Sequence, residues 1–329
     1  MCAASGIQPP DWVHRKENIM GRVSGKQKIK LSAMAKREEK WALLFVAAPT
    51  IGFLLFMLWP IIFAFLTSLT TWNGAKGFAG MLDRFCGFDN YIKLFTDAKF
   101  WKTLTTTVIY LIGIPIGMIL GLICAMGMNR KIPGVRVLRT MYYVPVISSL
   151  VAVSILWAWV YNYDYGLLNV IIKGLTGMHG PNWLGDEALI KVSMIIFMVW
   201  KGLGTSIILY LAGLQNIPRD YYEAAMVDGA NGWQKFRNIT VPLLSPVTFY
   251  IMITSMIGGF QVFVEVQVMT KNGGIGYSAA TMVFYLYQKA FESFQLGYAS
   301  AIAVILAIII FIITAINFAM QDKWVKTID

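Results

Sequence analysis

The sequence has the composition of a membrane protein. Its 329 residues are 57% hydrophobic and 14% charged, with a mean hydropathy of +0.61. Soluble chains carry about 25% charged residues, so this composition excludes an ordinary soluble protein. The net charge of +11 comes from basic residues that gather in the first forty positions and beside apolar runs. That distribution indicates contact with the lipid bilayer rather than with nucleic acid.

Little in the chain points to catalysis or to a bound cofactor. The three cysteines, Cys2, Cys86 and Cys124, lack the spacing of a metal site or a disulfide framework. The chain has two histidines and no G-x4-G-K-[ST] phosphate-binding loop. We therefore expect no catalytic residue, no metal and no cofactor held by this chain.

The first forty residues differ from the rest. Residues 1–40 are polar and basic without hydrophobic periodicity, which predicts a cytoplasmic tail that is largely disordered. The tail has no apolar core, so we expect no cleavable signal peptide. Translation starting at Met1 and translation starting at Met20 both fit the sequence. Residues 41–329 are predicted to form the membrane domain.

Apolar runs long enough to cross a bilayer at 1.5 Å per residue follow the tail. Pro49 and Pro60 are expected to bend the first. Gly113, Gly117 and Gly121 leave one face of the second bare enough for another helix to approach closely. We predict an all-α, polytopic membrane fold with six transmembrane helices. The predicted spans cover residues 43–66, 104–128, 142–161, 190–214, 246–269 and 297–320.

The basic residues predict the orientation of these spans. The loop at 129–139, after the second span, holds four basic residues and no acidic one. With this loop inside, the inner segments carry eighteen lysines and arginines and the outer segments carry nine. Because basic loops favour the cytoplasmic side, we predict a multi-pass protein of a bacterial-type plasma membrane with both termini in the cytoplasm.

The segment between the fourth and fifth spans is too polar to lie in lipid. Pro218 suits a first helical turn, Asp220 lies near the positive helix start, and Gly229 is a natural helix stop. Asn231 and Gln234 have the spacing of a capping box, which predicts a second short helix that begins at Asn231.

Prolines mark the end of this segment. Pro242 is expected to end the second helix, and Ser245 with Pro246 is expected to cap the fifth span. We predict a helix-turn-helix within residues 215–245 that lies against the membrane and presents side chains to a partner.

The same loop carries a spaced motif. Glu223-Ala224-Ala225, Gly229 and Ile239-Thr-Val-Pro242 follow the order E-A-A, three residues, glycine, nine residues, I-x-L-P, with Val241 in place of leucine. In this pattern the segment resembles the EAA loop of permease subunits of binding-protein-dependent ABC importers. The alternative is an ordinary amphipathic cytoplasmic loop.

Two later segments resemble permeases of the carbohydrate-uptake class, of the maltose and multiple-sugar type. These segments are residues 260–270 and 285–299. The turn at 271–275 keeps two glycines of that class but lacks its proline, so a non-sugar solute stays open. The resemblance covers the chain from about Glu39 to its C-terminus.

The resemblance implies a type I ABC importer permease fold within a larger complex. Two homologous permease subunits then bind an ATPase dimer that carries ATP and Mg, and an extracytoplasmic solute-binding protein delivers a sugar or oligosaccharide. The EAA loop is then a coupling helix seated in a cleft of the ATPase. The residues expected to couple are Tyr222, Glu223, Ala224, Ala225, Met226, Asp228, Gly229, Ile239 and Pro242.

The residue types suit a helix that enters a cleft of the ATPase. Ala224 and Ala225 keep the helix slim enough to enter a cleft. Tyr222 and Met226 would each contribute roughly 1.5–3 kcal/mol if buried in the partner. Glu223 is expected to pair with a basic residue there.

The resemblance also places a sugar site at mid-membrane, in the fourth and fifth spans. A charge at the bilayer centre costs about 2.5–3.5 kcal/mol, so each polar group there needs a reason. Lys201, Ser255 and Gln261 fall near mid-membrane by their distance along the helices, and Glu265 falls nearer the outer mouth. The candidate path residues are Lys201, Gly202, Thr205, Ser255, Gly259, Gln261 and Glu265.

Other roles compete for these residues. Hydrogen bonding between helices is the alternative for Ser255 and Thr205. For Lys201 we expect a cavity-facing side chain, the alternative being a pairing with a carboxylate or with the backbone.

Two other classes compete with an ABC permease. An ion-coupled secondary transporter would need internal repeats and intramembrane carboxylate pairs, whereas the chain offers the peripheral Glu265 and no convincing repeat. A polytopic membrane enzyme would need a catalytic cluster. Co-purification of an ATPase separates the permease from both.

Overall fold

The computed structural model describes residues 33–75, 77–129 and 134–325. These residues form helices and turns, with one isolated antiparallel bridge between Thr70 and Phe85. The predicted all-α class is therefore confirmed. Most of the predicted tail, and residues 130–133 of the basic loop, lie outside the described residues. The chain divides into two units, residues 1–61 and 62–329, which are described separately.

The first unit is a run of helix. It contains α2 (Ala33–Phe53), the π-helical turn η1 (Leu54–Leu58) and the start of α3 (Trp59–Ser68). Helix therefore begins before residue 41, where the membrane domain was predicted to start. Its apolar side chains, such as Phe45 and Phe56, are mostly exposed, as suits contact with lipid.

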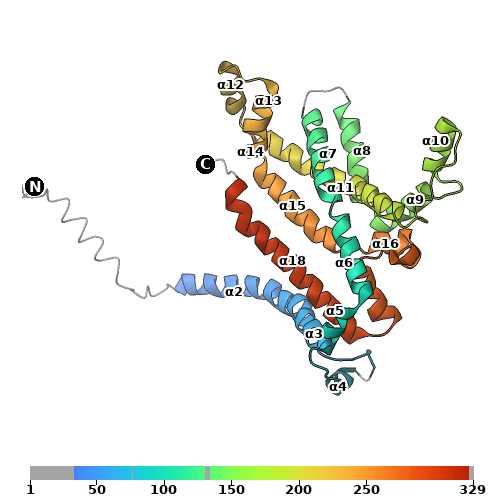
Figure 1. The fold of residues 1–329 in the computed structure, drawn as a ribbon. Helices are drawn as coiled ribbons and strands as arrows, with labels where there is room; N and C mark the ends of the chain where they lie inside the picture. The colour runs from blue at the N-terminus through green and yellow to red at the C-terminus, as the bar shows by residue number, and fades with distance from the viewer. Residues whose placement is uncertain (1–32, 76, 130–133, 326–329) are drawn as a thin grey trace, which may run out of the picture. The chain divides into compact units, whose positions relative to one another are not determined.

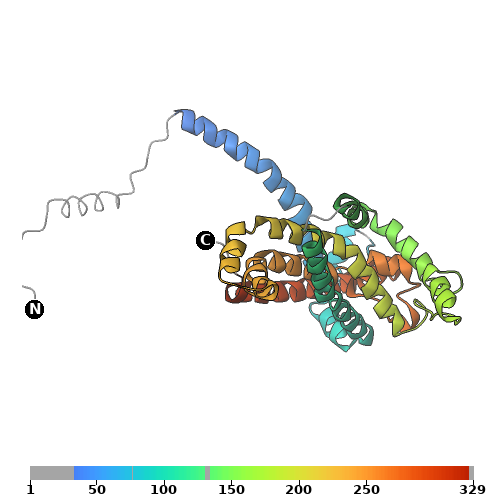
Figure 2. The ribbon, with the colours of Figure 1, turned by 90° about the horizontal axis from the view of Figure 1, so that it is seen from above.

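The second unit holds the remaining helices (Figure 1). In chain order they are α4 (Gly77–Leu82), α5 (Asp89–Thr96), α6 (Ala98–Tyr110), α7 (Gly113–Met128), α8 (Val135–Ile147), α9 (Leu150–Val160), α10 (Leu167–Thr176), α11 (Leu189–Asn216), α12 (Arg219–Val227), α13 (Gly232–Lys235), η2 (Phe236–Thr240), α14 (Val241–Leu243), α15 (Ser245–Phe260), α16 (Val264–Met269), η3 (Ile275–Tyr277), α17 (Met282–Tyr287), η4 (Gln288–Glu292) and α18 (Leu296–Trp324). Helices α15 and α18 pack together and run side by side in both views (Figures 1 and 2).

Membrane spans can be recognised from length and composition. Among the described residues, four helical runs qualify: Trp41–Ser68, Ala98–Met128, Leu189–Asn216 and Leu296–Lys323. Two bent helix pairs each qualify when taken together, which brings the number to as many as six. The second span begins earlier than residue 104, because the Asp97 side chain caps α6 by accepting a hydrogen bond from the Lys99 backbone N–H.

The third predicted span, 142–161, is not one straight helix. Helices α8 and α9 meet at 111° at Ser148 and Ser149. Both serines have extended backbone angles, with ψ of 144° and 128°. Hydropathy does not detect this break, because the residues on both sides of it are apolar.

The fifth predicted span, 246–269, is right at its start, since α15 begins at Ser245 with Pro246 in its first turn, but its end and the cap before it are wrong. Pro242 does not end the preceding helix: α13, η2 and α14 form one helical run that bends by 59° into α15. Ser245 does not act as a side-chain N-cap, since its hydroxyl donates to the carbonyl of Pro242 at 2.6 Å. The helix then ends at Phe260, and α16 is a separate short helix.

The glycine repeat does allow the close helix approach that the sequence predicts. Helix α7 packs along α11. A Cβ added at Gly113 would lie 3.3 Å from side-chain atoms of Ile195 and Val199, and one at Gly121 would lie 2.7 Å from Ser206 Cβ. A side chain at either position would force the two helices apart.

Candidate functional site

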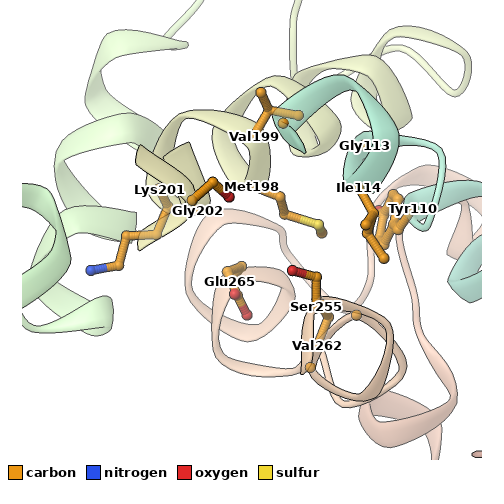
Figure 3. Close-up of a pocket in the computed structure, with 14 residues that line it drawn as sticks. Tyr110, Gly113, Ile114, Met198, Val199, Lys201, Gly202, Ser255, Val262 and Glu265 are labelled. Carbon is orange, nitrogen blue, oxygen red and sulfur yellow. The ribbon is translucent and has the colours of Figure 1, made fainter. Parts of the chain in front are cut away.

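A cavity of about 230 Å³ lies between α6, α7, α11, α15 and α16 (Figure 3). Its walls combine glycines and serines with larger apolar side chains such as Ile114, Met198 and Val262. On α11 the lining positions include Met198, Gly202 and Ser206, which are four residues apart and therefore share one helix face. On α15 they include Ser255 and Gly259, also four apart.

Most of the predicted path residues meet at this cavity. Gly202, Ser255, Gly259 and Glu265 line it, and so does the stem of Lys201. Two predicted residues do not belong to it. Thr205 is exposed on another face of α11, and Gln261 is exposed at the C-terminal cap of α15.

The structure corrects the expected orientation of Lys201. Its ammonium group turns away from the cavity (Figure 3) and donates to backbone carbonyls at the break between α8 and α9. The acceptors are the carbonyls of Pro145, Val146 at 3.5 Å and Ser148 at 3.1 Å. These carbonyls have lost their helical partners at the break, so the lysine satisfies them and caps the negative end of α8.

Sequence reasoning missed several lining residues. Tyr110 lines the cavity, and its hydroxyl donates to the Ala279 carbonyl at 3.1 Å. Gly117 faces the cavity, since an added Cβ there would meet nothing within 4 Å. Ser206 was also missed, although its four-residue spacing from Gly202 was a usable signal. The glycine repeat therefore has two roles, since Gly113 and Gly121 pack against α11 and Gly113 and Gly117 line the cavity.

The second candidate site is the loop between α11 and α15. Its first helix, α12, ends in a Schellman motif: the Ala230 N–H donates to the Ala225 carbonyl at 2.8 Å, and the Gly229 N–H donates to the Met226 carbonyl at 3.1 Å. Gly229 has φ of +76°, which an L-residue rarely adopts. The predicted helix stop at Gly229 is confirmed.

The predicted capping box of the second helix is also present. The Gln234 N–H donates to Asn231 Oδ1 at 2.9 Å, and the Asn231 N–H donates to Gln234 Oε1 at 2.7 Å. Two reciprocal bonds therefore fix the turn between α12 and α13. This short connection leaves little freedom between the two helices.

The predicted coupling residues divide into an inward and an outward group. Tyr222 faces inward: its hydroxyl lies 2.9 Å from Thr240 Oγ1, and its ring packs against the core with Ile239. Pro242 is half-buried in α14. Glu223, Ala224, Asp228 and Gly229 are exposed, Ala225 is partly buried, and Met226 is 55% exposed.

The outward group also includes Val227 and Trp233, which are not among the nine predicted coupling residues. Val227 is 89% exposed at the end of α12, and Trp233 is 66% exposed in α13. Met226, Val227 and Trp233, here called the apolar tip, are each more than half exposed. In Figure 1 this loop lies at the top of the second unit, as do the facing ends of α7 and α8.

Comparison with known proteins agrees with this architecture. Residues 113–326 match the family model of the binding-protein-dependent transport system inner membrane component. The chain is 35% identical over 280 residues to the lactose transport system permease protein LacF of Rhizobium radiobacter, covering 84% of this chain and 92% of that protein. It is 33% identical over 289 residues to the arabinooligosaccharides transport system permease protein AraP of Bacillus subtilis, covering 85% and 88%.

A solved structure has the same fold. The chain superposes on a chain of a bacterial alginate ABC transporter, crystallised with its alginate pentasaccharide-bound periplasmic protein, with a TM-score of 0.75 and 22% identity, covering 88% of this chain and 97% of that one. The protein described here therefore belongs to the family of binding-protein-dependent transport system inner membrane components, the multi-pass permease subunits of ABC importers.

Proposed function

We propose that this permease forms the path for a sugar or oligosaccharide and that its 215–245 loop couples the path to an ATPase. The observation that carries the proposal is the cavity described above, whose walls combine glycines and apolar side chains with two serines and one carboxylate. The glycines leave room for a bulky ligand, and the serines and the carboxylate offer hydrogen-bond partners to its hydroxyl groups.

Two further observations favour a sugar as the solute. The segments at 260–270 and 285–299 resemble carbohydrate-uptake permeases, and relatives that match most of this chain are named for lactose and arabinooligosaccharide transport. A type I importer permease for a non-sugar solute remains the second candidate, favoured by the missing proline at 271–275.

The coupling proposal rests on the exposed tip of the loop. Met226, Val227 and Trp233 expose apolar surface at the end of the molecule that the basic-residue count assigns to the cytoplasm. Burying each of these side chains in a partner would contribute roughly 1.5–3 kcal/mol. Tyr222 then has a different role from the one that the sequence suggested. It holds α12 to η2 through Thr240, so that the tip is presented on a stiff support.

The partners follow from this assignment. An ATPase dimer that carries ATP and Mg would receive the loop, a second homologous permease would complete the path, and an extracytoplasmic solute-binding protein would deliver the sugar. Both termini of this chain would then lie in the cytoplasm. A secondary transporter is not favoured, because the cavity contains a single carboxylate rather than a pair.

The experiment is reconstitution of the purified complex, with its binding protein, in proteoliposomes. A panel of saccharides is screened for stimulated ATP hydrolysis, with amino acids and oligopeptides as non-sugar solutes. We expect at least one saccharide to stimulate hydrolysis, and only when the binding protein is present. Stimulation by a non-sugar solute alone would contradict the substrate class, and uptake without any associated ATPase would contradict the function.

A further inference from the structure

We propose that the mid-membrane cavity is electronegative and therefore selects uncharged solutes over anionic ones, with Glu265 as the residue that sets this preference. The inference rests on the proposed function, since it narrows the sugar class to neutral saccharides. It excludes uronates, sugar phosphates and sugar sulfonates. Two charged residues, Lys201 and Glu265, line the cavity, and the sign of its potential depends on where they direct their charged groups.

Glu265 directs its carboxylate at the cavity. It is the second residue of α16, and its neighbour Val266 is completely buried, so the helix is fixed in place. Figure 3 shows the Glu265 carboxylate and the Ser255 hydroxyl facing the same space. Backbone N–H groups of Phe263 and of Glu265 itself lie near the carboxylate. Among the described residues, Glu265 forms no ion pair.

Lys201 forms no ion pair with that carboxylate and acts on it only through space. An ammonium group has three donors, and three backbone carbonyls at the α8–α9 break surround this one. The positive charge sits against the negative C-terminal end of α8, which compensates it locally. The lysine therefore offers the solute its aliphatic stem, and the charged group that faces the cavity is the Glu265 carboxylate.

A single carboxylate in a confined space of low polarity has a predictable effect. Its oxygens accept hydrogen bonds from solute hydroxyl groups, and such charge-assisted bonds are stronger than neutral ones. The same charge repels an anionic solute, and the repulsion is weakly screened away from bulk water. The cavity is therefore suited to a neutral polyol and unsuited to an acid.

The test measures the sign of the charge directly. Cys2, Cys86 and Cys124 are replaced by serine, and Ser255→Cys is introduced into the full-length chain, purified in detergent with the subunits that accompany it. The thiol is then reacted with the trimethylammonium-ethyl and the sulfonato-ethyl methanethiosulfonates, which are similar in size and opposite in charge. Rates are normalised to those of the Met178→Cys variant, because Met178 is 69% exposed in a distant loop.

We expect the cationic reagent to react with the thiol of the Ser255→Cys variant at least tenfold faster than the anionic one after normalisation. Adding Glu265→Gln, which keeps the size of the side chain, is expected to lower this ratio at least fivefold. The matched control is Glu187→Gln, an exposed carboxylate paired with Lys102 outside the cavity, and it should leave the ratio unchanged.

Equal reaction rates for the cationic and anionic reagents, or a rate ratio that Glu265→Gln does not alter, would overturn the inference. The proposal of sugar transport would still stand. Gly258→Cys, where an added Cβ meets nothing within 4 Å, is measured in parallel. If neither thiol reacts, the cavity is not open to solvent and the inference falls. If the charge preference holds but no saccharide stimulates the ATPase, the proposed sugar function fails instead. In the saccharide panel, uronates and sugar phosphates are expected to give no stimulation.

Discussion

Tyr298 donates its hydroxyl to Asp97 Oδ2 at 2.7 Å, a bond between residues 201 positions apart. Tyr285 donates to the same oxygen, and the other carboxylate oxygen caps α6 through the Lys99 backbone N–H. The ammonium group of Lys289 lies over both tyrosine rings, 5.4 and 5.6 Å from their centroids. One carboxylate therefore ties the start of α6 to α17 and α18.

Replacing this carboxylate is predicted to destabilise the protein. Asp97→Asn keeps a capping oxygen but removes the charge that both tyrosines contact. Charge-assisted hydrogen bonds are stronger than neutral ones, so we expect a loss of about 1–3 kcal/mol in the free energy of unfolding. Thermal unfolding of the purified protein measures this. Asp164→Asn, at an exposed aspartate, is the control and should unfold like the wild type. An Asp97→Asn protein with wild-type stability would contradict the assignment.

The same site predicts a pH dependence. Burial raises the pKa of Asp97, but the hydrogen bonds from Tyr285, Tyr298 and the Lys99 backbone outweigh it, so the pKa lies below its ordinary 3.8. The folded state thus binds the proton less tightly than the unfolded chain. The stabilisation by the ionised Asp97 carboxylate is complete when the pH is above the ordinary pKa. It is lost as the pH falls through the lowered pKa of the folded state. In acid titrations of stability, the difference between wild type and Asp97→Asn should therefore shrink only below about pH 4.

The turn at Gly229 gives a second prediction. Its Cβ position is open, so a substitution there is strained by its φ of +76° and not by a clash. Gly229→Val is expected to cost about 1–3 kcal/mol locally and to abolish transport, because the apolar tip changes position. Gly229→Asn, which tolerates a left-handed backbone, should keep much of the activity. Gly232→Ala, also in open space but with a helical backbone, is the matched control. Solute uptake in proteoliposomes measures the effect, and wild-type uptake by Gly229→Val would contradict it.

The charge at Glu223 gives a third prediction. This side chain is exposed on α12 beside the apolar tip. If the ATPase offers a cation there, Glu223→Lys turns attraction into repulsion, whereas Glu223→Gln only removes the attraction. We expect normal membrane insertion in both variants, at least a tenfold loss of uptake for the lysine variant, and a smaller loss for glutamine. Pull-down of the ATPase beside uptake separates lost docking from lost coupling. Equal behaviour of the two variants would show that Glu223 has no charged partner.

Lys201 gives a fourth prediction, because it satisfies the carbonyls at the α8–α9 break. Lys201→Met removes the donor and leaves those carbonyls unpaired, at about 1–3 kcal/mol for each group left without a partner. We expect a lower unfolding temperature, with partial recovery in Lys201→Arg. Lys191→Met, on the same helix outside the break, should have little effect. If Lys201→Met unfolds like wild type, the lysine does not support the break.

The orientation of the chain gives a fifth prediction. Val137 is 62% exposed beside the basic loop, and Met178 is 69% exposed after α10. In a chain without native cysteines, Val137→Cys should react with an impermeant reagent only from the cytoplasmic side and Met178→Cys only from the outside. Labelling of both from the same side would contradict the predicted topology.

Local rules predicted the turn within the loop but not its end, since Pro242 does not end the second helix and Ser245 does not cap α15. The Gly229 stop and the Asn231–Gln234 capping box were read correctly because helix termini depend on neighbouring residues. The cavity was predicted in part, since Gly202, Ser255 and Gly259 lie on spans that the family places at the site. Helical spacing alone would have added Ser206.

Contacts between residues far apart in the sequence could not be predicted. Lys201 was expected to face the cavity, but its partners are carbonyls freed by a break in another helix, more than fifty residues away in sequence. Tyr222 was expected to contact a partner protein, but Thr240 holds its hydroxyl after the chain has turned back on itself. Neither partner can be inferred from the residue type, since both arise only once the helices are packed.

The bend between α14 and α15 has a mechanical consequence. From Trp233 to Ser255 the chain is helical apart from Leu244, which is 1% exposed and fits against α11 close to Gly213. The exposed tip and the cavity wall are therefore joined by one nearly continuous helix, which bends at a buried leucine. No long loop separates the two residues, so we expect a displacement of Trp233 to move Ser255 rather than to be absorbed along the way.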